Sequence, residues 1–168
     1  RGAITLIGIL LILAFGLALL LKDQMFIGIM IGYGLLNFGY SFGLKRIPLL
    51  DILIISLGFQ LRIFAGGAIA MAPISRWLIL MIFLGALMLS LGKRRGDLLI
   101  YLSGNKPIPN YLKAYDLSFS NYAMVFLSAI STVAYILYTM SEEVFTRIGH
   151  EEVYFTNLFV VMGMLRYL

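Results

Sequence analysis

Long apolar runs separated by short charged clusters make up almost the whole chain. A helix needs about 20 apolar residues to cross a bilayer core, and six runs approach that length. They cover residues 3–21, 25–44, 48–71, 76–92, 118–140 and 153–168. We therefore predict an all-α polytopic membrane protein, a single transmembrane domain of six helices, with a longer connector over residues 93–117.

The composition supports this class and excludes several kinds of site. Of the 168 residues, 61% are hydrophobic and 12% are charged, whereas soluble proteins average roughly half and a quarter. The chain contains no cysteine, so disulfides, thiolate metal sites and cysteine nucleophiles are excluded. The net charge of +5 is informative here through its position along the chain, and we expect no nucleic-acid partner.

The positive charges divide unevenly between the two ends of the predicted helices. One set of ends carries nine of them: Arg1, Lys45, Arg46, Lys93, Arg94, Arg95, Lys106, Lys113 and Arg166. The other set carries three, beside an acidic stretch: Lys22, Arg76 and Arg147, with Glu142, Glu143, Glu151 and Glu152. Because Lys and Arg accumulate on the cytoplasmic side, we expect the connector and the turn after residue 44 to face the cytoplasm.

Polar side chains gather where the second run ends and the third begins. Tyr33, Asn37 and Tyr40 are spaced by four and three residues, so they share one face of a helix. Lys45 follows that face, and Asp51 opens the next run. Tyrosines and lysines also anchor helix ends among lipid headgroups, and for each residue alone that interpretation stays open. Together they predict a polar site at the cytoplasmic mouth.

Arg62 interrupts the third run deep in the predicted membrane. It follows Asp51 by eleven residues, which places it on the same helical face but roughly 16 Å away. An arginine at the centre of a helix costs at least about 2.5 kcal/mol to insert, so it needs a partner. We favour a water-filled anionic site, and an arginine held by a neighbouring helix is the alternative. Gly58, Gly66 and Gly67 leave room there for a ligand or for close helix packing.

The fourth run leads into a basic cluster. Lys93, Arg94 and Arg95 are consecutive, and Asp97 follows them. Three cations at a helix end are ordinarily a positive-inside signal. They lie on the same predicted side as Lys45, however, and such convergence suits a site for several phosphates, in which a carboxylate helps to hold a divalent ion.

The stretch "YSFGLKRIPLLDILIISLGFQLRIFAGGAIAMAPISRW", followed by "LGKRRGDL", resembles the UbiA superfamily of intramembrane prenyltransferases, and within it the branch of polyprenyl-phosphate phosphoribosyltransferases. The matching positions are Tyr40, Leu44, Lys45, Asp51, Arg62, Ala65, Gly66, Gly67, Pro73, Ser75, Trp77, Gly92, Lys93 and Arg94, with "LRY" at 165–167. The resemblance implies nine transmembrane helices around a central cavity, of which these six look like the third to the eighth. The chain would then be a fragment, inactive alone, that begins after the family's first aspartate-rich motif.

The resemblance also implies an activity. An enzyme of this branch transfers 5-phosphoribose from phosphoribosyl diphosphate to a polyprenyl phosphate and releases diphosphate. It depends on Mg²⁺, which the missing motif would hold, and serves cell wall biosynthesis. We expect a location in a bacterial plasma membrane, with the active site facing the cytoplasm. The oligomeric state stays open, a homo-oligomer included.

The same resemblance suggests roles for individual residues, although it assigns no catalytic residue. The cations Lys45, Lys93 and Arg94 are expected to hold phosphates at the mouth. Tyr40 and Asp51 are expected to orient them, and Arg62 to meet the acceptor phosphate or to order the cavity. Asp97 is the candidate metal ligand, at a position where the branch usually has glutamate.

Three other functions remain as alternatives. A UbiA-type prenyltransferase acting on an aromatic acceptor predicts a DxxxD motif near Asp97, and this chain lacks it. A transporter would use Arg62 as a charge in its pathway, but would place polar faces through to the outer side. A noncatalytic scaffold leaves Arg62 and the one-sided basic cluster without a purpose.

Overall fold

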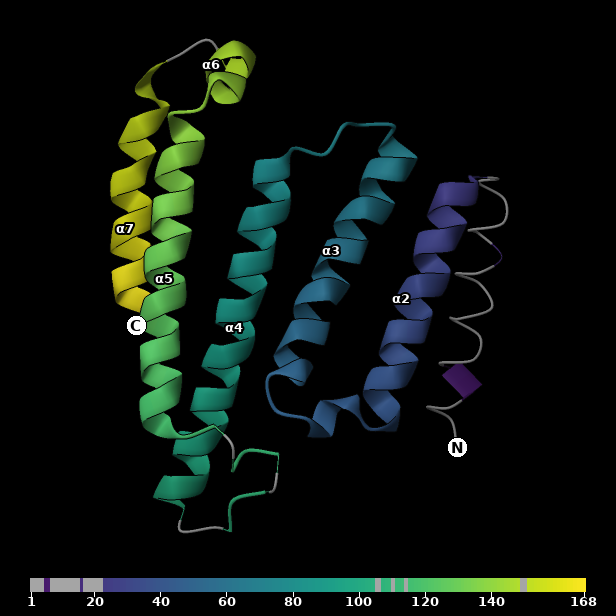
Figure 1. The fold of residues 1–168 in the computed structure, drawn as a ribbon, viewed down its shortest axis with the longest axis vertical. Helices are drawn as coiled ribbons and strands as arrows, with labels where there is room; N and C mark the ends of the chain where they lie inside the picture. Colours follow the sequence, from purple (N-terminus) through teal and green to yellow (C-terminus); the bar gives the residue numbers. More distant parts are fainter. Residues whose placement is uncertain are drawn as a thin grey trace.

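The computed structural model describes residues 5–6, 16, 23–104, 107–109, 111–113, 115–148 and 151–168. In that part of the chain the regular structure is entirely helical (Figure 1). The predicted first span, 3–21, lies outside the described residues except at three positions, so the helices that follow start with the second predicted span.

Four helices are long and apolar enough to cross a membrane. They are α2 (Gln24–Phe42), α3 (Leu50–Ala70), α4 (Arg76–Ser103) and α5 (Leu117–Thr139). Shorter elements complete the described fold: η1 (Leu44–Arg46), α6 (Glu142–Ile148), η2 (Glu151–Phe155) and α7 (Thr156–Tyr167). The prediction of an all-α polytopic membrane protein is confirmed.

Helix α4 differs from the predicted span, because it continues far into the region predicted as a connector. It has 28 residues and ends at Ser103, whereas the apolar run ends at residue 92. Lysine, arginine and leucine all favour a helix, so the basic cluster ends the apolar run without ending the helix. The break comes at Gly104, ahead of Pro107, as expected of residues that terminate helices.

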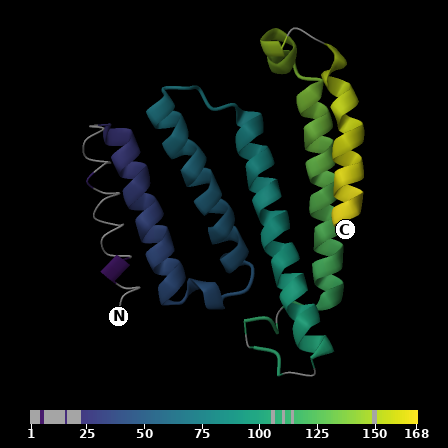
Figure 2. The same cartoon turned by 180° about the vertical axis from the view of Figure 1, so that it is seen from behind.

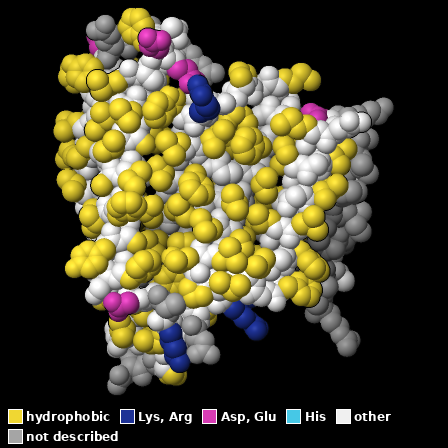
Figure 3. All heavy atoms as spheres, viewed as in Figure 1, with side chains coloured by type: hydrophobic (Ala, Val, Ile, Leu, Met, Phe, Trp, Pro, Cys, Tyr) yellow, Lys and Arg dark blue, Asp and Glu magenta, His cyan; other side chains and the backbone are white. Residues whose placement is uncertain are grey.

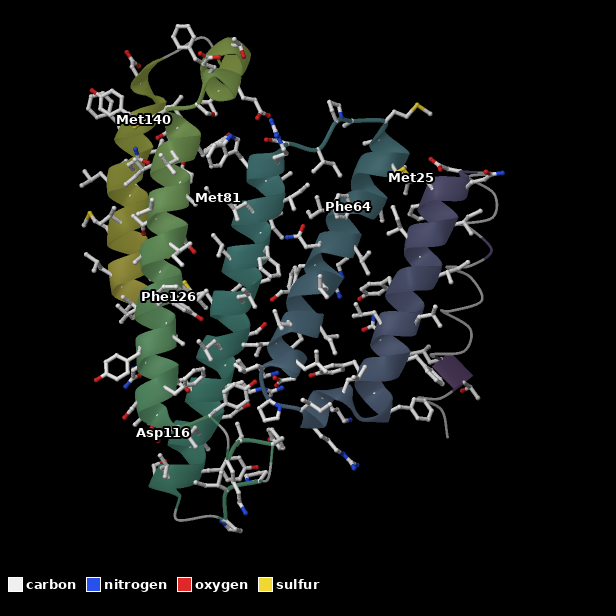
Figure 4. All side chains as sticks on the ribbon, in the orientation of Figure 1. Met25, Phe64, Met81, Asp116, Phe126 and Met140 are labelled. Atoms are coloured by element: carbon white, nitrogen blue, oxygen red, sulfur yellow. The ribbon has the colours of Figure 1, made fainter. Side chains whose placement is uncertain are left out.

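The long helices stand side by side in the order α2, α3, α4, α5, and α7 packs along α5 (Figures 1 and 2). The turn that holds η1 and the connector from α4 to α5 lie at one end of this row. The α3–α4 turn and α6 lie at the other end (Figure 1). In Figure 4, Asp116 marks the first end of α5 and Met140 the second. The fold therefore brings the two predicted polar segments to one end.

The surface of the row is largely apolar between its ends. Figure 3 shows hydrophobic side chains over the middle of one face and charged side chains toward its two ends. Large apolar side chains such as Phe38, Phe126 and Phe159 are exposed, as suits contact with lipid. A compact buried cluster lies at the connector end and consists of Ile52, Leu91, Leu112, Tyr115 and Met124. It packs α3, α4, α5 and the connector together beneath the polar groups described next.

Candidate functional site

Asp51 is the centre of a buried polar cluster at the connector end. It lies in the first turn of α3 and is only 1% exposed. The Nε of Arg94 donates a hydrogen bond to its Oδ2 at 2.7 Å, and the Tyr115 hydroxyl donates to its Oδ1. Both carboxylate oxygens are engaged, as a buried charge requires. We refer to Asp51, Arg94, Asp97 and Tyr115 as the Asp51 cluster.

Arg94 joins α4 to α3 through this cluster and is held on several sides. Its Nη1 lies 3.7 Å from the Oδ2 of Asp97, and its guanidinium carbon lies 5.4 Å from the ring centroid of Tyr111. Tyr40 is half-buried in the last turn of α2, at the same end of the row. Its Nη2 has no hydrogen-bond partner among the described residues. Arg94 is thus anchored through Nε while donors remain for an anion.

Tyr115 completes the cluster from the connector, and the sequence analysis missed it. Its side chain is 1% exposed, and its hydroxyl accepts a hydrogen bond from the backbone N–H of Leu49 at 2.7 Å. Burial, together with the hydrogen bond to Asp51, raises the pKa of Tyr115 above its usual value, so the hydroxyl keeps its proton at neutral pH. The sequence alone assigns no role to this tyrosine, because its partners lie in other elements.

The predicted lysines share this end of the molecule but stay outside the cluster. Lys45 lies in η1 and is exposed. Lys93 is exposed on α4, one residue before Arg94. Among the predicted residues, the structure therefore brings Asp51, Arg94 and Asp97 into contact, and leaves the two ammonium groups in solvent at the same end.

Arg62 lies apart from the cluster and faces α2. Its Nη2 donates to the Tyr33 hydroxyl at 2.5 Å, and its guanidinium carbon lies 5.2 Å from the ring centroids of Tyr33 and Phe59. The predicted common face is therefore divided, since Asp51 contacts α4 while the long Arg62 side chain reaches toward α2. Among the described residues Arg62 has no carboxylate partner. Its contacts match the alternative of an arginine held by a neighbouring helix.

The molecule also contains a cavity of about 540 Å³ near its opposite end. It lies between α4, α5, α6 and α7, and its lining includes Trp77, Met81, Ser131, Tyr138 and Glu143. Met81 is labelled between α4 and α5 in Figure 4. The Ser131 hydroxyl is buried without a hydrogen-bond partner in the described part of the chain. None of the predicted site residues lines this cavity.

Comparison with known proteins identifies relatives of the chain. It is 32% identical over 130 residues to the decaprenyl-phosphate phosphoribosyltransferase of Corynebacterium glutamicum, an alignment that covers 77% of this chain and 39% of that protein. The chain is a homologue of the decaprenyl-phosphate phosphoribosyltransferases. This finding confirms the resemblance predicted from the sequence.

Two further relatives carry the same name. The protein from Mycolicibacterium smegmatis is 32% identical over 115 residues, which cover 68% of this chain and 36% of that protein. The protein from Mycobacterium tuberculosis is 24% identical over 115 residues, which cover 68% and 38%. The chain thus spans less than two fifths of the length of these phosphoribosyltransferases. No protein-family model matches it.

The resemblance to phosphoribosyltransferases implied magnesium, and the described residues can be tested for a fit. They contain no group of three or more histidine, cysteine, aspartate or glutamate side chains placed to hold a metal. Asp51 is turned toward Arg94 and Tyr115, and Asp97 lies beside Arg94. Since Mg²⁺ requires a set of oxygen ligands, the described residues do not form a magnesium site by themselves.

Proposed function

We propose that the protein containing this chain transfers 5-phosphoribose from phosphoribosyl diphosphate to a polyprenyl phosphate. The observation that carries the proposal is the 32% identity, over 77% of the chain, to an enzyme named decaprenyl-phosphate phosphoribosyltransferase. The apolar helices place the chain in a membrane, where a polyprenyl lipid resides. The names of these relatives do not specify the donor, so phosphoribosyl diphosphate is part of the proposal.

The cations at the connector end suit the phosphates of both substrates. Lys45 and Lys93 are exposed. The Nε of Arg94 is fixed by Asp51, and its Nη2 has no hydrogen-bond partner among the described residues. A fixed arginine can bind phosphate oxygens with a defined orientation, whereas flexible lysines supply positive charge. We assign donor binding to these three side chains, and leave Arg62 as a candidate for the acceptor phosphate.

The reaction needs one bond to form and one to break. A phosphate oxygen of the lipid attacks C1 of the ribose, the bond from C1 to the diphosphate oxygen breaks, and diphosphate leaves with the electron pair. Negative charge develops on the leaving oxygen, so cations placed beside it lower the barrier. Holding both substrates at one mouth adds the advantage of orientation.

Magnesium is proposed as the cofactor, with Asp97 as a candidate ligand. Its carboxylate is partly exposed and 3.7 Å from the Nη1 of Arg94. Because the described residues do not form a complete site, we assign no step of the reaction to the ion. Titration of the complete gene product with Mg²⁺, with Asp97→Asn as the comparison, tests this assignment.

The proposed location is a bacterial plasma membrane, with the connector end in the cytoplasm. Phosphoribosyl diphosphate is a polar, soluble donor and needs an aqueous entrance, while the lipid acceptor enters from the bilayer. The positive-inside rule favours this orientation, because the cationic turn and connector share one end.

The proposed function is tested with membranes that contain the complete gene product. They are given labelled phosphoribosyl diphosphate and polyprenyl phosphate, and labelled lipid is extracted and counted. We expect transfer, and a fall of about 10- to 100-fold in Lys45→Ala and in Arg94→Ala, the range for a lost hydrogen bond to a charged group. Arg46→Ala is the matched control, because Arg46 is an exposed neighbour of Lys45 in η1.

Two outcomes contradict the proposal. One is a wild-type membrane that makes no labelled lipid but prenylates an aromatic acceptor from a prenyl diphosphate. The other is full transfer by both alanine variants, which would remove the site assignment while leaving the reaction.

A further inference from the structure

We infer that Tyr115 is a positioning residue. It fixes the turn between α2 and α3, which carries Lys45, against Arg94 and so shapes the donor site. The structural part of this inference rests on contacts within the chain. Its consequence for substrate rests on the proposed function. Nothing in the sequence analysis or in the names of the relatives assigns a role to this tyrosine.

One hydroxyl connects three segments that are far apart in the sequence. Tyr115 donates to Asp51 and accepts from the N–H of Leu49, while Asp51 accepts from Arg94. The tyrosine lies on the connector, Leu49 and Asp51 on the entry to α3, and Arg94 on α4. Since Tyr115 is fully buried, its position is set by packing as well as by its hydrogen bonds.

The hydrogen bond from the Leu49 N–H to Tyr115 matters because the backbone of Leu49 is strained. Leu49 precedes α3 with φ 65° and ψ −38°, a conformation that residues with a Cβ rarely adopt. It has no side-chain cap of its own, and the Tyr115 hydroxyl serves as the partner of its N–H. A strained residue keeps its conformation only where the surroundings hold it. The phenol is therefore what we expect to keep the turn in this form.

The held turn carries Lys45, and the same cluster orients Arg94. Lys45 lies in η1, four residues before Leu49. A change at Tyr115 therefore moves the lysine relative to the guanidinium without removing either cation. Phosphoribosyl diphosphate carries two phosphorylated positions and requires several cations at fixed separations, whereas the lipid offers one phosphate. We expect the loss to fall mainly on the KM for the donor.

The positioning itself can be measured without any reaction. The chain contains no cysteine, so Arg46→Cys and Lys113→Cys introduce a clean pair of spin-label sites in the complete gene product, provided its remainder also lacks cysteine or has been freed of it. Both positions are exposed, one in η1 and one on the connector. Tyr115→Phe is expected to broaden the distance distribution between the labels. Tyr122→Phe is the matched control, because Tyr122 is 76% exposed on α5.

A second variant, Asp51→Asn, tests the inference if Tyr115→Phe does not fold. Asp51→Asn keeps the size of the side chain and the bond from Leu49 to Tyr115, but weakens the hold on Tyr115 and Arg94. It is expected to broaden the distribution as well. An unchanged, narrow distribution in whichever of the two variants folds overturns the inference.

Kinetics test the consequence for the substrate. We expect Tyr115→Phe to raise the KM for phosphoribosyl diphosphate about tenfold, the factor for roughly one lost hydrogen bond to a charged group. The KM for polyprenyl phosphate should change less than threefold, and Tyr122→Phe should match the wild type. A purely structural role would reduce the amount of folded protein and leave the KM values of the remainder unchanged. If the wild type shows no transfer but Tyr115→Phe still broadens the distance distribution, the proposed function is rejected and the positioning role of Tyr115 is retained.

Discussion

At the scale of single residues, the Asp51–Arg94 pair has to offset the cost of its burial and still leave a donor of Arg94 for a ligand. Asp51 is 1% exposed, and the Arg94 side chain is 12% exposed. Taking both charges out of water is expensive, and their attraction offsets that cost only when further hydrogen bonds satisfy them. Tyr115 supplies such a hydrogen bond to Asp51, and Asp97 adds a carboxylate 3.7 Å from the Nη1 of Arg94. The pair therefore holds α3 to α4 and leaves the Nη2 of Arg94 without a hydrogen-bond partner among the described residues.

Removal of one partner is predicted to destabilise the protein more than removal of both. Asp51→Ala leaves Arg94 buried and unpaired, a loss of about 3 kcal/mol in unfolding free energy, near the low end for buried pairs because Arg94 keeps some exposure. The double variant Asp51→Leu/Arg94→Met should recover most of that stability. Unfolding by detergent or denaturant titration in mixed micelles measures each free energy.

Asp97→Ala is the control for this comparison. Asp97 is 32% exposed and lies 3.7 Å from Arg94, so its loss should cost no more than about 1 kcal/mol. Equal losses of unfolding free energy for Asp51→Ala and Asp97→Ala would show that the buried pair contributes no more to stability than the more exposed one. Under the proposed function, the double variant should keep the loss of transfer of about 10- to 100-fold expected of Arg94→Ala, despite its recovered stability, because it lacks Arg94.

The sequence marked the members of this pair but not their pairing. Asp51 and Arg94 are 43 residues apart, and each was singled out because a charge interrupts or ends an apolar run. Their contact depends on α3 and α4 lying side by side with matched heights, which no periodicity in either helix specifies. Tyr115 was given no role, because a tyrosine in a connector is ordinary until its buried partners are known.

At the scale of elements, the hydropathy of the sequence predicted the bounds of three of the four long helices closely and those of the fourth poorly. Runs at 25–44, 48–71 and 118–140 became Gln24–Phe42, Leu50–Ala70 and Leu117–Thr139. For these three helices the chain turns close to where the apolar run ends. For α4 the two boundaries separate, because the basic residues leave the apolar run and still form a helix to Ser103. Its extra turns are what carry Arg94 and Asp97.

The glycines of α3 were predicted to allow close approach, and the structure distinguishes between them. A Cβ on Gly67 would lie 2.5 Å from the Cδ1 and 2.7 Å from the Cγ1 of Ile74, whereas a Cβ on Gly66 would meet nothing within 4 Å. Ile74 belongs to the turn between α3 and α4. Gly67 is therefore required for the packing of this turn, and Gly66 is not.

Gly67→Ala is predicted to destabilise the protein by about 1–3 kcal/mol, the usual range for overpacking. Gly66→Ala, one residue earlier, should be neutral or stabilising by up to about 1 kcal/mol, because alanine favours a helix over glycine. Thermal unfolding of the purified variants in detergent compares them. Adding Ile74→Ala to Gly67→Ala should remove the clash, so the two changes should be strongly non-additive. Similar melting of Gly66→Ala and Gly67→Ala would contradict the packing argument.

At the scale of the whole molecule, successive turns of the chain lie at opposite ends of the row of helices, so each end has its own set of side chains. One end gathers the η1 turn, the basic part of α4 and the connector, and the other gathers the α3–α4 turn and α6 (Figure 1). Glu142 and Glu143 open α6. Lys45, Arg46, Lys93, Arg94 and Arg95 lie with the Asp51 cluster at the first end, while the second end holds these acidic side chains together with Arg76. This excess of cations at one end suits the proposed site for soluble phosphates on one side of a membrane.

The division predicts which positions face the same side of the membrane. Helices of 19 to 28 residues are about 28 to 42 Å long, enough to cross the hydrocarbon core once each. With single cysteines introduced into the complete gene product, freed of any other cysteine, Arg46→Cys and Lys113→Cys should react with a membrane-impermeant maleimide only in inside-out vesicles. Arg76→Cys and Glu152→Cys should react only in right-side-out vesicles. Reaction of positions 46 and 76 from the same side would mean that α3 does not span the membrane. Reaction of all four from the reversed sides would keep the fold and place the connector end outside the cytoplasm.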